Sequence, residues 1–335
     1  MFEPALLLVI IVAAALVFDF TNGAHDCANA IATIVSTKVA TPRFAVTAAA
    51  LLNLCGALAG TEVAKTLGGG IVIPQVVEGC QLLVLAALCG AIVWNLVTWH
   101  FGIPSSSSHA LIGGLVGAAI AHAGLDALNG QGILYKVLIP LVASPLAGFA
   151  AGMFFMWSIY WICARTHRAR VNATFRRLQF FSAGMMATSH GLNDAQKTMG
   201  IITLALLIFG EIDSVEVPFW VKLSCAGAMA LGTAFGGWKI VKTMGSRIFK
   251  LEPVHGFTAE TSATLVIAGA SFFGAPVSTT QTIAACIFGV GSTRRLSAVR
   301  WPLALHLATA WILTLPAAGM VGFFSFKALR IFWPS

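Results

Sequence analysis

Ten long apolar runs, separated by short polar segments, make up most of this 335-residue sequence. They cover roughly residues 4–35, 44–60, 80–101, 104–122, 133–162, 178–208, 217–236, 257–273, 276–291 and 301–326. A helix needs about 20 apolar residues to cross a bilayer. Only 10% of the residues are charged, against about 25% in soluble domains. The sequence therefore predicts an all-α polytopic membrane protein, whose multiple spans lie in a lipid bilayer.

The basic residues gather in four of the connecting segments. These segments are residues 36–43, 163–178, 237–256 and 292–300, whereas the other connections are poor in lysine and arginine. Because positive loops stay in the cytoplasm, we expect these segments inside and both termini outside. The net charge of +8 could also suggest a nucleic-acid partner. The restriction of the charge to short loops argues against that partner.

Two of the apolar runs contain polar residues at their centre. The first run holds Gly23-Ala24-His25-Asp26, and the sixth holds Gly191-Leu192-Asn193-Asp194. Both runs are too long for one plain helix, so we expect each of them to break at mid-membrane. A charged residue at the bilayer centre costs about 3 kcal/mol, which favours a functional role for the two acids. The alternative is that each acid only pins helices together by hydrogen bonds.

Three pairs of motifs recur in the same order in the two halves of the chain. Besides the acidic motifs, residues 63–68 (VAKTLG) match 240–245 (IVKTMG), and residues 102–114 (GIPSSSSHALIGG) match 274–286 (GAPVSTTQTIAAC). This order indicates an internal duplication. The first half starts outside and the second inside, so the repeats are inverted. We predict a first repeat at 1–163, a cytoplasmic Arg-rich linker at 164–177 and a second repeat at 178–335.

Inverted repeats with interrupted helices are typical of secondary transporters, whose site lies at the midplane between the repeats. Carboxylate and amide oxygens around the motifs suit a hard cation. The candidate coupling residues are Asp26, Asp194, Asn22, Asn29, Asn193 and His25, with a Na⁺ site at Asp26, Asn29, Asp194 and Asn193. A carboxylate can equally carry a proton. Imidazole titrates near neutral pH, so His25 in the slot of Asn193 favours H⁺, unless His25 is only a hydrogen-bonded interior side chain.

Each Gly-x-Pro of the third motif pair is followed by a cluster of hydroxyl side chains. Hydroxyls at a new helix start can cap free amides, and helix N-termini also bind anions. Two facing re-entrant hairpin tips would surround a tetrahedral oxyanion with donors. The candidate substrate-binding residues are Ser105, Ser106, Ser107, Ser278, Thr279, Thr280, Gln281 and Lys197. Lys197 could instead be the counter-charge of Asp194. Glu260 is a candidate for gating or coupling, with an interfacial anchor as the alternative.

At these residues the chain resembles the inorganic phosphate transporter family, also called Pit or Pho-4. The resemblance rests on a duplicated G-x-[NH]-D motif, duplicated G-x-P-x-S-[ST] tips and the GF-T-AE stretch at Gly256–Glu260. It covers nearly the whole chain. It implies a cation-coupled symporter with phosphate between the hairpin tips and the cations near the motif acids. His25 and the ANAIAT segment resemble the bacterial low-affinity branch, in which proton coupling is usual.

The resemblance therefore predicts import of inorganic phosphate across the cell inner membrane, coupled to H⁺ or Na⁺, without a cofactor. Some similarly short family members carry sulfate, so a sulfate permease is an alternative. The sequence leaves open whether metal travels with phosphate and whether the protein forms a homodimer. Asp26→Asn and Asp194→Asn are each expected to abolish coupled uptake without impairing insertion, because an intramembrane charge is removed.

Two other classes of protein fit parts of the sequence. Serine, histidine and aspartate within a membrane could form an intramembrane hydrolase, which needs one nucleophile and one base. Both halves offer polar tips, however, and Gln281 stands where the first tip has His109. This duplication favours alternating access over an enzyme. A passive anion channel is the third alternative, and its flux would need no ion gradient.

Overall fold

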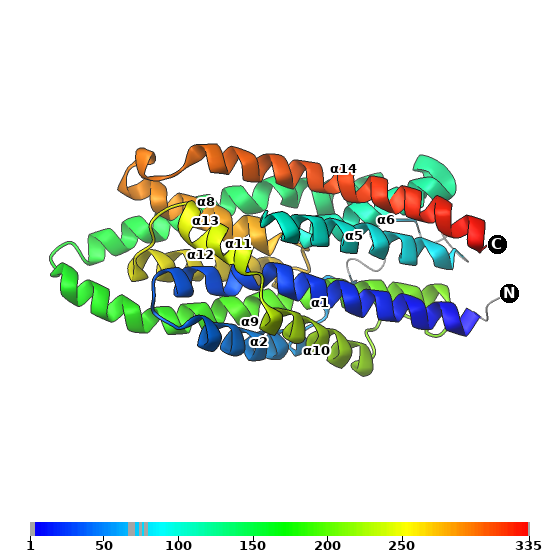
Figure 1. The fold of residues 1–335 in the computed structure, drawn as a ribbon, viewed down its shortest axis with the longest axis horizontal. Helices are drawn as coiled ribbons and strands as arrows, with labels where there is room; N and C mark the ends of the chain where they lie inside the picture. Colours follow the sequence, from blue (N-terminus) through cyan, green and yellow to red (C-terminus); the bar gives the residue numbers. More distant parts are fainter. Residues whose placement is uncertain (1–3, 66–70, 74–75, 77–79, 334–335) are drawn as a thin grey trace.

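The computed structural model describes residues 4–65, 71–73, 76 and 80–333. Ten long helices in these ranges coincide with the ten predicted runs (Figure 1), within several residues at each end, except that the sixth helix begins at Arg168, ten residues before its run at 178. They are α1 (Pro4–Ser36), α2 (Pro42–Leu58), α5 (Gln81–Phe101), α6 (Ser107–Ala123), α8 (Ile139–Ile162), α9 (Arg168–Ile208), α10 (Phe219–Phe235), α12 (Pro253–Phe272), α13 (Thr279–Arg294) and α14 (Trp301–Phe332). Shorter elements connect them: η1 (Gly124–Ala127), α7 (Gly130–Ile133), η2 (Leu134–Leu138), α11 (Trp238–Lys242), η3 (Thr243–Arg247) and η4 (Leu296–Ala298). The all-α fold is therefore confirmed.

The predicted breaks at the acidic motifs are wrong, because α1 and α9 run through them as continuous helices of 33 and 41 residues. The polar side chains there form hydrogen bonds with side chains of other elements. They do not compete for the backbone hydrogen bonds of the helix, which therefore continues. The length of α9 has a second cause. Its first turns hold exposed arginines such as Arg168 and Arg177, and arginine favours helix. Most of the predicted linker at 164–177 thus belongs to α9.

The chain instead breaks at the two Gly-x-Pro motifs. Gly102 and Gly274 follow α5 and α12 with φ of 68° and 65°, a conformation that favours glycine. Ser106 then caps α6 and Ser278 caps α13, each accepting a hydrogen bond from the backbone N–H three residues on. Figure 1 shows α5 and α6 towards the end that carries both termini, and α12 and α13 towards the opposite end. The two re-entrant hairpins therefore enter from opposite ends.

Glycines let helices of one half pack directly on helices of the other half. At four such glycines an added Cβ atom would lie 1.9–2.5 Å from a carbonyl oxygen of the facing helix. The pairs are Gly117 with Gly319 (α6 on α14), Gly152 with Cys286 (α8 on α13), Gly23 with Met229 (α1 on α10) and Gly56 with Thr188 (α2 on α9). Small residues at membrane helix contacts allow such close approach. These matched contacts support the predicted duplication, whose inverted repeats and boundaries stay predictions.

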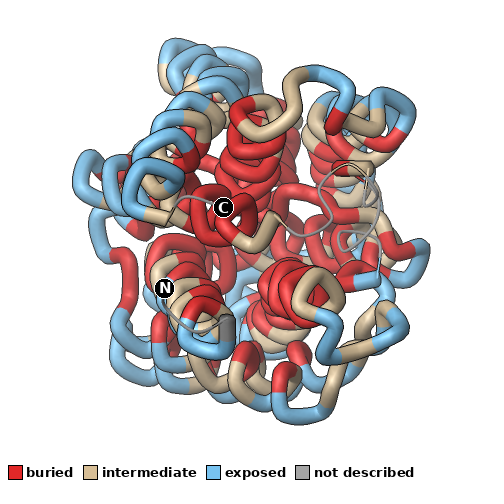
Figure 2. Tube along the Cα trace, turned by 90° about the vertical axis from the view of Figure 1, so that its right-hand side faces the viewer, coloured by how far each residue is buried: buried red, intermediate tan, exposed pale blue. Residues whose placement is uncertain are grey.

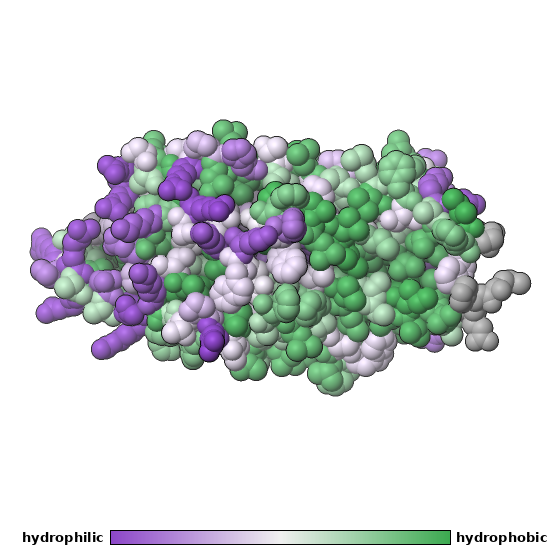
Figure 3. Space-filling model, viewed as in Figure 1, coloured by the Kyte–Doolittle hydropathy of each residue, from purple (hydrophilic) through white to green (hydrophobic). Residues whose placement is uncertain are grey.

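The surface is apolar over much of its length. Large apolar side chains face outward, among them Trp161 (84% exposed) and Phe273 (83% exposed). Five helices within the described ranges are long and apolar enough to cross a membrane. Figure 3 shows hydrophilic side chains gathered at the end opposite the termini, with mostly apolar surface over the rest of this face. Viewed from the termini, buried segments gather in the interior and exposed ones at the periphery (Figure 2).

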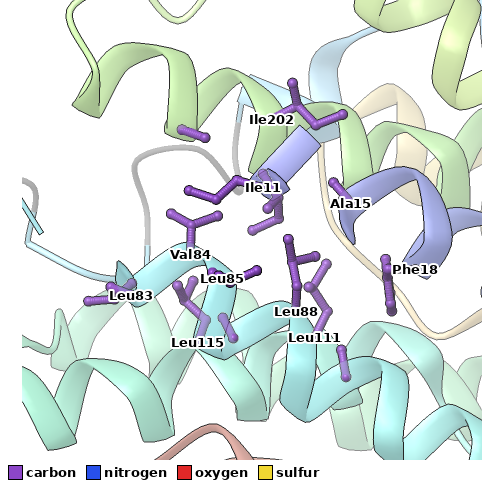
Figure 4. Close-up of a cluster of buried hydrophobic side chains, with 14 of the residues drawn as sticks. Ile11, Ala15, Phe18, Leu83, Val84, Leu85, Leu88, Leu111, Leu115 and Ile202 are labelled. Carbon is purple, nitrogen blue, oxygen red and sulfur yellow. The ribbon is translucent and has the colours of Figure 1, made fainter. Parts of the chain in front are cut away.

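Among the described residues, the buried apolar side chains form two clusters. The first cluster packs α1 against α5, α6 and α9, with Ile11, Phe18 and Leu88 among its members (Figure 4). On α1 this cluster ends at Phe18, and the second cluster begins at Cys27. The polar motif of α1 therefore lies at the junction of two apolar regions, deep inside the molecule.

Candidate substrate and cation site between the hairpin tips

The two motif acids lie together at the centre of the molecule. Asp26 of α1 and Asp194 of α9 are 2% and 1% exposed. One ligand atom from each of them and one from His190 lie within 4.8 Å of one another. Two residues separated by 168 positions in the sequence thus form a single centre. Such a cluster of carboxylate and imidazole groups can hold a cation or a proton.

Lys197 joins this centre to both hairpin tips. The side chain is buried, and its ammonium donates hydrogen bonds to Asp194 Oδ1, to Ser108 Oγ of the first tip and to the Val277 carbonyl of the second. An ammonium has three donors, so all three are used. Lys197 is therefore the counter-charge of Asp194 and also a link between the tips. On the other side of the carboxylate, His190 Nε2 lies 2.9 Å from Asp194 Oδ2.

The hydroxyls of the second tip bind the two acids directly. Thr279 donates to Asp194 Oδ2 over 2.7 Å, and Thr280 donates to Asp26 Oδ1 over 3.2 Å. The Asn29 amide donates to both threonine hydroxyls, at 3.2 and 2.9 Å. One hairpin tip is thus fastened to both halves of the acidic centre.

Besides Lys197, Thr279 and Thr280, the other five predicted substrate-binding side chains divide into three groups. Ser106 and Ser278 are helix caps, as the capping alternative proposed. Ser105 donates to the Thr98 hydroxyl over 2.9 Å, so its proton is already used within the first half. Ser107 and Gln281 differ, because the Ser107 hydroxyl and the Gln281 side-chain oxygen are buried without a hydrogen-bond partner among the described residues. These two groups remain available to a ligand.

His25 and Asn193 occupy matching places in the two halves. His25 Nδ1 lies 2.6 Å from Asp26 Oδ1, and its Nε2 lies 3.1 Å from the Thr98 hydroxyl on α5. The Asn193 amide donates to Ser271 of α12 over 2.8 Å. Each of these side chains therefore reaches from its motif helix to the first helix of its own hairpin, but only His25 also contacts an acid.

Three of the predicted cation-coupling residues have an unused oxygen. The side-chain oxygens of Asn22, Asn29 and Asn193 are buried and accept no hydrogen bond from the described part of the chain. Buried polar groups are normally hydrogen-bonded, so such atoms point to a ligand. Amide oxygens cannot bind an anion, but they suit a hard cation. The oxygens of Asn29 and Asn193, together with the two motif acids, thus fit a small cation beside an anion, whereas Asn22 lies one turn nearer the termini.

Glu260 lies away from this centre. Its Oε1 accepts hydrogen bonds from Thr33 (2.5 Å) and Gln179 (2.9 Å), and its Oε2 accepts one from Ser182. Glu260 is fully buried, which argues against the alternative of an interfacial anchor. Thr33 follows Asp26 by seven residues, or about 10 Å along a helix. Glu260 thus lies about two helical turns from Asp26, towards the Arg-rich end.

Comparison with known proteins identifies the class of molecule to which this arrangement belongs. Residues 22–322 match the phosphate transporter family. The chain belongs to this family. It is 52% identical over 317 residues to a probable low-affinity inorganic phosphate transporter of Rhizobium meliloti, covering 94% of each chain. It is 46% identical over 327 residues to one of Bacillus subtilis, covering 97% of this chain and 98% of the relative.

One solved structure has the same fold. The chain superposes on a sodium-dependent phosphate transporter with a TM-score of 0.87, covering 97% of this chain and 99% of the other at 24% identity. Family membership makes the chain a multi-pass membrane transporter and excludes the hydrolase alternative.

Some residues of this family member's site were not predicted from the sequence. His190 contacts Asp194, and Ser108 and Thr98 bind Lys197 and Ser105. A signal for His190 existed, because it precedes Asp194 by one helical turn and so shares its face. His190 also directly precedes Gly191, as Asn22 directly precedes Gly23. Ser108 belongs to the hydroxyl cluster of the first tip, which was the available signal for it, whereas the contact of Thr98 with Ser105 leaves no local pattern in the sequence.

Proposed function

We propose that this chain is a secondary active symporter that imports inorganic phosphate with a cation, H⁺ in preference to Na⁺, across the bacterial cell membrane. One observation carries the proposal. The N-termini of α6 and α13 meet at a buried centre, where hydroxyls, an ammonium and two carboxylates lie together. This combination offers donors to an anion and acceptors to a cation within one site.

The anion would bind at the two helix N-termini. Unpaired backbone N–H groups and the helix dipole favour negative charge there. The free hydroxyl of Ser107 would donate to a phosphate oxygen, and Thr279 and Thr280 could turn their hydroxyls from the acids to the substrate. Lys197 supplies positive charge next to both tips. A tetrahedral oxyanion would thus meet donors from both hairpins at once.

The two acids favour phosphate over sulfate. At neutral pH phosphate keeps at least one proton and can donate a hydrogen bond to a carboxylate. Sulfate has no proton to donate, so Asp26 and Asp194 would repel it. A site built from donors alone would accept both anions. The carboxylates therefore support the phosphate assignment over the sulfate alternative.

The preference for H⁺ rests on the two nitrogen-bearing side chains, His25 and Lys197, that already contact the acids. His25 contacts Asp26, and Lys197 contacts Asp194. A Na⁺ ion at either carboxylate would have to displace or tolerate these groups. A proton can instead be held by the His25–Asp26 pair without displacing either side chain. The sodium dependence of the solved relative is a property of that protein.

The arrangement of the ends supports the predicted orientation. Both termini lie at one end of the molecule, and the exposed arginines at the start of α9 lie at the other (Figure 1). We propose that the Arg-rich end faces the cytoplasm. The burial of Ser107, Thr279 and Asp194, each at most 2% exposed, supports alternating access over an open channel.

The test is uptake of labelled phosphate into proteoliposomes, with pH and Na⁺ gradients imposed separately and sulfate as competitor. We expect saturable uptake that follows the pH gradient and is inhibited weakly by sulfate. His25→Asn should reduce the dependence on the pH gradient, whereas His306→Asn, the same change at an exposed histidine of α14, should not. Uptake that follows only the Na⁺ gradient would refute proton coupling. Uptake that needs no gradient and does not saturate would refute symport.

A further inference from the structure

The second buried acid of α1, Asp19, has no part in the centre described above. Asp19 precedes Asp26 by seven residues, about 10 Å along the helix, on the side of the termini. It is fully buried, and its Oδ1 accepts a hydrogen bond from Thr198 of α9 over 2.9 Å. The side chains of Asn22 and Cys225 adjoin the same carboxyl group. Asp19 thus lies at the junction of α1, α9 and α10.

Two oxygen atoms at this junction lack a partner. Asp19 Oδ2 and Asn22 Oδ1 are buried and make no hydrogen bond with the residues that the structure describes. Since buried oxygens are normally paired, two neighbouring orphans indicate a missing electron-pair acceptor. Both are oxygens without a proton to give, so a hydrogen-bond donor such as water or a cation fits them, and the missing positive charge described next favours the cation.

No lysine, arginine or histidine of the described ranges forms an ion pair with Asp19. The ionisable groups that face it are Asp194 from α9 and Cys225 from α10. Neither of these can supply positive charge. The ammonium of Lys197 is bound to Asp194 and to both tips. An intramembrane carboxylate without a counter-charge is expensive and marks a functional site by default.

We propose that Asp19, together with Asn22 and Thr198, forms a second position for the coupling cation, on the termini side of the central pair. The ligand is a monovalent cation: a proton would sit on Asp19, and Na⁺ would be bound by the oxygens of all three side chains. The inference rests on the symport proposed above. It adds one cation position to the transport cycle.

The position of Asp19 fits a route along α1. Residues 19, 22, 26, 29 and 33 follow one another at spacings of three and four, so they share one face of the helix. All five side chains are polar and at most 2% exposed. Carboxyl groups contact this face at three levels: Asp19, the central pair, and Glu260 through Thr33. A cation can thus meet an acid about every 10 Å.

The experiment measures the number of cations moved with each phosphate. Reversal potentials of reconstituted protein give this number under imposed pH gradients and, separately, under imposed Na⁺ gradients. Asp19→Asn should lower the number of cations moved with each phosphate by one, in the experiment whose gradient is that of the ion that binds at Asp19. Asp19→Glu should restore the wild-type number. Thr203→Val removes another buried hydroxyl of α9, one that donates only to the Met199 carbonyl. It serves as the matched control and should keep the wild-type number.

An unchanged ratio of cations to phosphate in Asp19→Asn would overturn the inference. If wild-type protein itself shows no cation coupling, the proposed function fails instead, so the two failures are distinguishable. Should Asp19→Asn not fold, Asn22→Leu provides a second test. It should raise the half-saturating concentration of the coupling cation roughly tenfold, the effect of about 1.4 kcal/mol. An unchanged half-saturating concentration would equally overturn the inference.

Discussion

The ion pair of Lys197 and Asp194 makes the strongest prediction about how the site is held together. Lys197→Met leaves a buried carboxylate whose remaining contacts are His190 and Thr279. Asp194→Asn leaves a buried ammonium with only neutral acceptors in Ser108 and Val277. Removing one partner of a buried pair costs about 3–5 kcal/mol. Each single substitution should therefore lower the melting temperature by roughly 4–7 °C, since the entropy of unfolding is about 2.1 cal/mol/K per residue.

The double variant Lys197→Met/Asp194→Asn separates the pair from its parts. It leaves neither charge uncompensated, so it should regain more than half of the lost stability. The assay is thermal unfolding of purified protein in detergent, followed by size-exclusion chromatography. Lys239→Met is the matched control, since Lys239 is an exposed lysine that donates to the His100 carbonyl. Losses that simply add in the double variant would refute the reasoning, as would an Asp194→Asn variant as stable as wild type.

Four further substitutions test three features of the structure. Ser107→Ala should weaken the apparent phosphate affinity in uptake assays ten- to a hundredfold, since a lost hydrogen bond to a charged group costs about 1.5–3 kcal/mol. Ser106→Ala should instead lower the stability in melting assays by about 1 kcal/mol, because a helix cap is lost. If both variants had the same effects in the two assays, this division of roles would be contradicted. Glu260→Gln should lower the stability by about 1–3 kcal/mol, because an amide N–H then faces hydrogen-bond donors. It should also reduce the cation dependence of uptake. If that dependence stayed at the wild-type level, Glu260 would have a structural role only. Gly117→Val should cost about 1–3 kcal/mol or more, because its Cβ would lie 1.9 Å from the Gly319 oxygen, and a wild-type melting temperature would disprove that contact.

Hydropathy and turn residues predicted the elements well because both are local properties. Each apolar run became a helix, and Gly102 and Gly274 mark the places where the chain turns. The predicted breaks in α1 and α9 failed because a polar side chain within a helix does not have to interrupt the backbone. Thr280 reaches Asp26, and Thr279 reaches Asp194, from another element. Such long-range satisfaction cannot be read from the helix itself.

The sequence predicted which residues form the site better than it predicted how these residues contact one another. The paired motifs indicated that Asp26 and Asp194 belong together, and the structure brings them together. They also led to the expectation that replacing either acid would spare folding. For Asp194 the structure predicts the opposite, because Lys197 would lose its counter-charge. The spacing of three residues placed Asp194 and Lys197 on one helical face. It could not show that Lys197 also contacts both hairpin tips.

The glycine contacts between the halves bear on how the protein is made. The first hairpin packs through α6 on α14, and α8 packs in the same way on α13. In both pairs the second helix is synthesised much later than the first. A ribosome will have finished α5 and α6 some 180 residues before α14 is synthesised. During that time the small-residue face of α6 has only lipid or the translocation machinery to cover it. We therefore expect the packing of the two halves to be completed late, and a chain truncated before α14 should be a substrate for membrane quality-control proteases.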